Sequence, residues 1–332
     1  MSERGLLQGD TKAGAIRVVS TLLKGAFVGS VLLAACSSPG VSASPDPTVV
    51  TNAPLASASS TTTPTTTSPS TTTGSTTTGS TTIPVTTSPP TTLPPEPGTV
   101  RPDWLGTRLL ELRPDGLGVP QPTPPELVNR RFPSPDLLPP PAGEEFEWTA
   151  GPVPPEIANR SSWRAECPVG LAGLTYLTLS FYGFDGSAHT GEMLVASEFA
   201  GEVVEAFRRL WEIRFPIEEM RVQDQAEMDA LPTGDGNVTG SFECRPAVGQ
   251  SGGWSMHAYG LAVDINPFHN PYTKAEVVAP ELASAYIDRS DLRPGMIVEG
   301  DTAVTAFDEM GWGWGGRWTT AKDWMHFSSN GR

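Results

Sequence analysis

Apolar and polar residues follow two different periods in the C-terminal half of the chain. Residues 174–182 alternate small or polar with bulky side chains, which predicts a half-buried strand, and residues 192–196 are its expected hairpin partner. Between 203 and 214 the apolar residues fall at helical spacing, and Pro216 is expected to end that helix. Other expected elements are strands at 217–222, 261–265 and around 326–327, a helix from Asp301 to Gly311, and a loop over 224–239. Because strands and helices mix without regular alternation, we predict an α+β fold with a mainly antiparallel sheet flanked by helices.

The N-terminal half lacks both periods, and its composition divides the chain. Residues 41–98 are nearly all Ser, Thr, Pro, Gly and Ala, a composition that cannot bury enough apolar surface to offset its ordering entropy. Residues 99–160 are Pro-rich but more apolar, so we expect an extended collar that packs on the domain without regular elements. The predicted organisation is a signal peptide over 1–35, a lipidated cysteine and disordered linker over 36–98, the collar over 99–160, and one globular domain over 161–332.

The first residues have the order of a secretory signal. Lys12, Arg17 and Lys24 precede the apolar run 25–35, which is shorter than the about 20 residues that a transmembrane helix needs. Residues 33–36, Leu-Ala-Ala-Cys, resemble the bacterial lipobox, in which cleavage precedes the cysteine and its thiol receives diacylglycerol. We therefore expect an extracytoplasmic protein that is anchored to the cell membrane through a lipid on Cys36 and faces the cell wall. The alternative is an ordinary cleavable signal with an incidental cysteine.

The cysteine count supports the lipid. An odd number of cysteines in an exported protein needs an explanation, and this chain has only Cys36, Cys167 and Cys244. Lipidation of Cys36 leaves two cysteines to pair in an oxidising compartment. A Cys167–Cys244 bridge would stabilise the fold by roughly 4–5 kcal/mol in the chain-entropy model. It would also fix the segment beside Arg245.

Charge and motifs exclude several functions. The formal net charge of −15 argues against nucleic acid as a partner, because phosphate binding needs basic surface. Residues 249–253 fit G-x-S-x-G, but glycines and Pro246 around them predict a loop and not a strand followed by a helix. No lysine has a serine three positions before it, so the S-x-x-K mechanism is absent, and there is no H-E-x-x-H motif. We expect a monomer.

Two histidines and a carboxylate are spaced as a set of metal ligands. His257 and Asp264 lie seven positions apart around Gly260, and His326 follows Asp323 by three positions near the C-terminus. Two histidines and one carboxylate suffice to hold a catalytic zinc ion, whose fourth position stays open. The sequence therefore predicts that His257, Asp264 and His326 bind Zn²⁺.

Asp323 is then left over as a proton acceptor, or it orients His326. Positions three apart face opposite sides of a regular strand, so Asp323 and His326 can both face the ion only if the backbone kinks between them. His189 and His269 lack partners at metal-like spacing. Trp312, Trp314 and Trp318 either wall the cleft or fill the core, and the sequence does not separate these two interpretations.

The two motifs in order resemble the zinc D-alanyl-D-alanine carboxypeptidases of the VanY type. The pattern S-x-H-x-x-G-x-A-x-D covers residues 255–264, and D-x-x-H-F covers residues 323–327. The similarity extends from about Trp163 to the C-terminus, although many relatives have Glu where this chain has Asp323. The resemblance implies the fold shared with the Hedgehog signalling domain and peptidoglycan stem peptides as substrate. It also implies that Arg245, which would otherwise be a solvated side chain, polarises the scissile carbonyl.

We therefore predict a zinc metallopeptidase that removes the terminal D-Ala from peptidoglycan stem peptides, with Asp323 as catalytic base and Arg245 on the carbonyl. An endopeptidase that cuts L-Ala–D-Glu or a cross-link is the enzymatic alternative. A zinc-stabilised module that binds the cell wall without catalysis is the other.

Overall fold

The computed structural model describes residues 96–247 and 252–332, so the predicted signal, the lipobox and the linker up to residue 95 lie outside the described residues. No helix in the described part is long and apolar enough to cross a membrane. The helices and strands, in chain order, are β1 Trp148–Pro152, α1 Pro155–Arg160, β2 Leu174–Tyr182, β3 Ala188–Ala196, α2 Ala200–Glu212, β4 Glu219–Met220, α3 Gln225–Met228, β5 Val238–Thr239, β6 Ala262–Asp264, β7 Tyr272–Lys274, β8 Val277–Ala279, α4 Thr302–Glu309, β9 Gly313–Trp314, β10 Lys322–Asp323 and β11 His326–Ser328. The predicted α+β class with mainly antiparallel pairing is confirmed, since among the strand pairs of the described residues only β4 and β5 are parallel.

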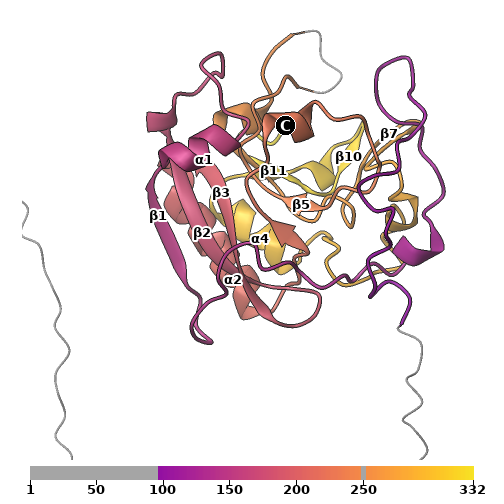
Figure 1. Cartoon of the computed structure of the whole chain (residues 1–332), viewed down its shortest axis with the longest axis horizontal. Helices are drawn as coiled ribbons and strands as arrows, with labels where there is room; N and C mark the ends of the chain where they lie inside the picture. Colours follow the sequence, from indigo (N-terminus) through magenta and orange to yellow (C-terminus); the bar gives the residue numbers. More distant parts are fainter. Residues whose placement is uncertain (1–95, 248–251) are drawn as a thin grey trace, which may run out of the picture. The chain divides into compact units, whose positions relative to one another are not determined.

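The long hairpin of β2 and β3 is the largest sheet, with β1 added at its edge (Figure 1). Leu174 pairs with Ala196 at one end and Tyr182 with Ala188 at the other, so the second strand begins four residues earlier than expected. Leu177, Leu179 and Met193 are buried under it, because the strands bury alternate side chains on one face. Helix α2 packs against β2 of this sheet, and α4 packs against α2.

Helices α2 and α4 cover the core beneath the hairpin. Val203, Phe207 and Leu210 of α2 lie three or four positions apart and are almost fully buried, as the helical period predicts. The predicted N-cap of α4 is confirmed, since Asp301 accepts a hydrogen bond of 2.9 Å from the backbone N–H of Val304. The core beneath the hairpin also includes Val263 and Phe327 from the strands that carry the motif residues.

Two small sheets follow, and the last part of the chain contributes to both. One has the order β6-β11-β9 and the other the order β10-β7-β8. The chain leaves β10 at Asp323 and enters β11 at His326 (Figure 1). The two motif residues thus belong to different sheets.

The collar contains more regular structure than expected. Its last part forms β1, which pairs antiparallel with β2, and the short helix α1, so the expectation of no regular elements is wrong there. The rest of the collar packs on the domain, with Leu110, Leu127 and Phe132 buried in a second apolar cluster beside Phe268 and Tyr286. The sequence missed β1 because it contains Gly151 and Pro152, which suit only an edge strand.

The stretch expected to be a loop between 224 and 239 also has regular elements. Asp224 and Glu227 form a capping box that begins the four-residue helix α3, with 2.8 Å from the Glu227 N–H to Asp224 Oδ1. Val238 and Thr239 form β5.

Candidate metal centre

A single turn of 3-10 helix, Met256–Tyr259, presents His257. The side chain of Ser255 caps this turn and accepts a hydrogen bond from the His257 N–H. Gly260 ends the turn with φ at 69°, and a Cβ on it would lie 2.6 Å from the backbone nitrogen of Ala196. The chain therefore needs glycine here to turn from His257 into β6.

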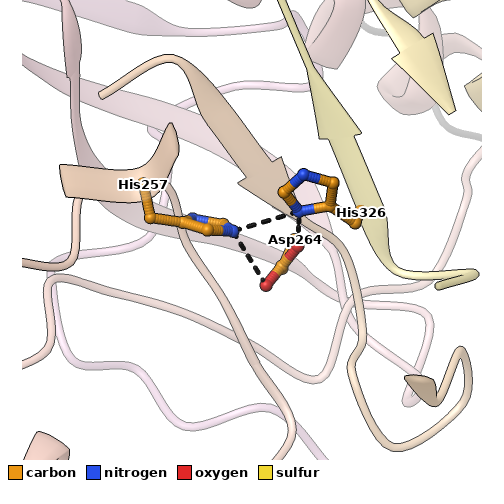
Figure 2. A group of neighbouring side chains, drawn as sticks. All are labelled: His257, Asp264 and His326. Carbon is orange, nitrogen blue, oxygen red and sulfur yellow. Dashed lines mark hydrogen bonds and ion pairs between the residues drawn. The ribbon is translucent and has the colours of Figure 1, made fainter. Parts of the chain in front are cut away.

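Asp264 and His326 are brought together by strand register. They are direct partners in the antiparallel pair of β6 and β11. His326 Nδ1 lies 3.0 Å from Asp264 Oδ1, and His257 Nε2 lies 3.2 Å from Asp264 Oδ2 and 3.2 Å from His326 Nδ1. Figure 2 shows the two rings and the carboxylate pointing toward one another. The structure thus assembles the three predicted ligands into a group that could hold a metal ion.

The outer nitrogen of each ring is engaged by a main-chain oxygen. His257 Nδ1 lies 2.6 Å from the carbonyl oxygen of Ser241, and His326 Nε2 lies 3.3 Å from the main-chain oxygen of Arg332. A carbonyl only accepts, so each outer nitrogen carries the hydrogen and each inner nitrogen bears a lone pair. Two imidazole lone pairs and a carboxylate then converge with no hydrogen between them. These groups repel one another, and a positive charge at their centre, either a metal ion or an added proton, offsets that repulsion.

The spacing of the two inner nitrogens and the two oxygens of Asp264 is compatible with zinc, and with one ligand atom per residue the three ligand atoms lie within 4.8 Å of one another. Two ligand atoms that are each about 2.0–2.1 Å from a tetrahedral ion lie about 3.3 Å apart. The separations here are 3.0 to 3.2 Å. The set of two imidazoles and one carboxylate is also the one that zinc accepts, with a position left for water or substrate.

Protons compete for the same lone pairs. Burial opposes the charge on Asp264, but once the rings are protonated, the charge of His257 and the hydrogen bonds that both inner N–H groups then donate hold the pKa of its carboxyl well below the usual range. Burial also opposes the charge on His326, but its hydrogen bond to Asp264 raises the pKa of the ring. Binding of a metal ion would release these protons.

Asp323 lies beside the group with one carboxylate oxygen unsatisfied. Its Oδ1 is buried without a hydrogen-bond partner in the described part of the chain, and burial together with the charge of Asp264 raises the pKa of the carboxyl to about 7. The charges of His326, His257 and Arg245 act in the opposite direction. The two residues between β10 and β11 supply the kink that the sequence required. Gly315 leaves room for this strand, because a Cβ on it would lie 2.5 Å from the Asp323 carbonyl oxygen.

Arg245 lies near the group and is held by its neighbours in sequence. Its Nε donates to Glu243 Oε2 at 2.5 Å, and the predicted bridge between Cys167 and Cys244 is present. Burial opposes its charge, but Glu243, Asp264 and Asp323 together raise the pKa of the guanidinium. The charge of Arg245 therefore acts on both carboxylates of the site.

The remaining candidate residues have other contacts. His189 lies between Asp136 and Asp185, and His269 is buried away from the three-ligand group with Asn237 and the Arg130 carbonyl. Trp312 and Trp314 are core residues, whereas Trp318 is half-buried with its ring 5.6 Å from that of His326.

Sequence reasoning missed the main-chain oxygens of Ser241 and Arg332, which carry no side-chain signature. It also missed Tyr272, which pairs with Asp323 across β7 and β10. Burial and the charge of Asp323 raise the pKa of this phenol.

Comparison with known proteins finds a match over the segment that contains both motifs. No curated protein and no solved structure matches the chain. A family model described as D-alanyl-D-alanine carboxypeptidase matches residues 248–329. This segment contains His257, Asp264, Asp323 and His326, and its resemblance to the VanY-type peptidases is thereby confirmed.

Proposed function

We propose that this protein is a zinc-dependent peptidase that acts on peptidoglycan stem peptides. One observation carries the proposal: two imidazole lone pairs and a carboxylate converge at 3.0 to 3.2 Å, with the outer N–H groups bound elsewhere. The match of residues 248–329 to a D-alanyl-D-alanine carboxypeptidase family model supports the substrate class.

His257, Asp264 and His326 would hold the ion, which when bound supplies Lewis-acid chemistry and lowers the pKa of a water molecule. Asp323 is the proton acceptor, because its buried Oδ1 has no other partner among the described residues and burial favours uptake of a proton by its carboxyl. It takes a proton from the attacking water and returns it to the leaving amine. Arg245 donates hydrogen bonds to the carbonyl oxygen as negative charge develops there.

We propose removal of the terminal D-Ala as the reaction, and the Hedgehog-like peptidase fold as the fold. An endopeptidase acting on L-Ala–D-Glu or on a cross-link uses the same residues and remains the second candidate. A binding module without catalysis would have no use for Asp323, whose unsatisfied oxygen favours an enzyme.

We also propose that a lipid on Cys36 anchors the chain outside the cytoplasm, and that the protein is a monomer. The anchoring proposal predicts that wild type partitions into detergent and that Cys36→Ser is released or left unprocessed.

Metal content and peptide mass test the function together. Wild type is expected to hold about one zinc ion per chain and to shorten a stem pentapeptide by the mass of one alanine. His257→Ala should lose both properties. His269→Gln is the matched control, because it alters another buried histidine that lies outside the three-ligand group. Full zinc in His257→Ala would remove that residue from the ligands, and an internal cut would favour the endopeptidase. Zinc-loaded wild type that binds stem peptides without cleaving them would favour the binding module.

A further inference from the structure

The tripeptide Glu243-Cys244-Arg245 is fastened to the metal centre by its main chain. The Glu243 N–H donates to the His257 carbonyl at 3.2 Å, and the Arg245 carbonyl accepts from the Ser255 N–H at 3.2 Å. The tripeptide therefore runs beside the turn that carries His257.

Cys244 fixes the middle of this tripeptide. It is fully buried, it is bonded to Cys167, and its N–H donates to Ser162 Oγ at 3.0 Å. With the backbone held at each of its three residues, the side chains at positions 243 and 245 keep a constant relation to the ligands.

Glu243 and Arg245 meet on the same side of the tripeptide. Glu243 Oε2 accepts from Arg245 Nε at 2.5 Å, and the two side chains are only 13% and 29% exposed. Within the described residues, Nε is the only nitrogen of the guanidinium that has a hydrogen-bond partner. Nη1 and Nη2 therefore keep their donors for another acceptor, and the guanidinium fork matches a carbonyl or carboxylate oxygen.

The neighbours of Arg245 include two carboxylates that could compete for these N–H donors. The charges of Asp264 and Asp323 both act on the guanidinium. Without another contact to hold it, the guanidinium of Arg245 would be drawn into an ion pair with Asp264 or Asp323. Glu243 competes for the guanidinium with a contact at Nε, the nitrogen nearest the side-chain stem.

We propose that Glu243 is a positioning residue that holds Arg245 by Nε, so that Nη1 and Nη2 face the carbonyl oxygen of the bound peptide. The inference rests on the proposed peptidase function and adds a residue to it. Glu243 acts through Arg245 and contacts neither the ion nor the substrate.

A double-mutant cycle tests this dependence in the full zinc-loaded chain. Arg245→Ala is expected to lower kcat about 10²–10³-fold on a stem pentapeptide, as loss of one such donor does. Glu243→Gln should lower kcat about 10-fold with little change in KM and full zinc, the size typical of a lost orienting partner. The double variant should be no worse than Arg245→Ala alone, because Glu243 has nothing left to position.

Glu219→Gln is the matched control. Glu219 and Arg221 form the same i,i+2 contact, with 2.5 Å from Arg221 Nε to Glu219 Oε1 and similar exposure, and their hydrogen bonds within the described residues do not involve the site. This variant should keep both kcat and zinc. Losses that multiply in the Glu243/Arg245 double variant, or an unchanged kcat in Glu243→Gln, would overturn the inference.

A measurement without turnover separates this inference from the proposed function. In ¹⁵N NMR spectra, the Arg245 Nε–H should exchange slowly with solvent in wild type and faster in Glu243→Gln, with Arg245→Ala providing the assignment. Unchanged exchange in Glu243→Gln overturns the inference whatever the activity. If zinc-loaded wild type cleaves no peptide, the proposed function fails, whereas the exchange rates still decide whether Glu243 holds Arg245.

Discussion

Two buried clusters in this protein contain similar residues but differ in how their polar atoms are satisfied. The closed cluster consists of Arg130, Glu218, Asn237 and His269, and the open cluster consists of His257, Asp264, Asp323 and His326. Each has buried histidine and carboxylate groups. Only the open cluster has converging lone pairs and an unsatisfied oxygen.

In the closed cluster each side-chain nitrogen and oxygen has at least one hydrogen-bond partner among the described residues. Glu218, which is 1% exposed, accepts from Arg130 Nε at 2.8 Å and from Asn237 Nδ2 at 2.8 Å. His269 Nε2 donates to the Arg130 carbonyl at 2.9 Å, and Nδ1 accepts from Asn237 at 3.2 Å. Burial lowers the pKa of His269 to about 4, so the ring is neutral, whereas Arg130 outweighs burial and lowers the pKa of Glu218. A network of this kind stabilises one arrangement.

In the open cluster several polar atoms are left available to bind a metal ion, a proton or a substrate. Asp323 Oδ1 has no hydrogen-bond partner among residues 96–247 and 252–332, and the inner nitrogens of His257 and His326 face the same carboxylate. The comparison teaches that residue type and burial do not distinguish a structural cluster from a reactive one. The balance of donors and acceptors does so.

The largest effect is expected from Asp323→Asn. The amide is nearly isosteric but cannot take a proton from water, so kcat should fall about 10²–10⁴-fold. Zinc content should stay at the wild-type level, since Asp323 is not among the proposed ligands. Parallel measurement of bound zinc and turnover checks this, and loss of zinc from the variant would make Asp323 a ligand or an orienting residue.

Among changes in the closed cluster, Glu218→Leu should have the largest effect. It should lower the free energy of unfolding and leave the reaction rate unchanged. It leaves Arg130 charged and buried, which costs about 3–5 kcal/mol of unfolding free energy. The double variant Arg130→Met/Glu218→Leu should recover much of the loss, because no uncompensated charge remains. Urea unfolding measures both, and kcat per folded molecule should stay unchanged. A tenfold fall in kcat at full folding would show that the closed cluster serves the reaction.

The sequence predicted the open cluster better than the closed one for a physical reason. The three proposed metal ligands lie in two short motifs, and each of those motifs folds locally into a turn or a strand. Arg130 and Glu218, by contrast, are 88 positions apart, and only the packing of the collar brings them together. No local pattern specifies such a pair.

The fold was predictable where the side-chain period was strong. The β2–β3 hairpin, α2 and the capped start of α4 were expected, and the structure contains them. The period gave no signal for β1, which owes its strand conformation to pairing with β2. Asp323 and His326 were expected to need a kink, but the sequence could not show that the kink is a change of sheet.

Without metal, the pKa of Asp323 predicts an effect on stability that depends on pH. Its carboxyl titrates near 3.8 when unfolded and at about 7 when folded, so the folded state favours the protonated form. The stability that this form contributes is complete below pH 4 and is lost as the pH rises to 7. In chelator, Asp323→Asn should therefore become more stable than wild type by an amount that grows over this range and is constant above it. Denaturation at pH 4, 6 and 8 checks this, and an equal difference at all three would place the pKa of Asp323 near its ordinary value.

The smallest effect is expected from Arg101→Ala, which removes the second arginine that contacts Glu218. Arg101 Nη2 lies 3.2 Å from Glu218 Oε1, but its side chain is 41% exposed, whereas that of Arg130 is 2% exposed. Solvent screens the exposed charge, so its loss should cost about 0–1 kcal/mol of unfolding free energy, and Glu218 keeps its contacts to Arg130 and Asn237. Urea midpoints of Arg101→Ala and Glu218→Leu, measured side by side, test this ranking. A loss of several kcal/mol from Arg101→Ala would mean that the closed cluster needs both arginines to neutralise Glu218, and that its balance extends to the protein surface.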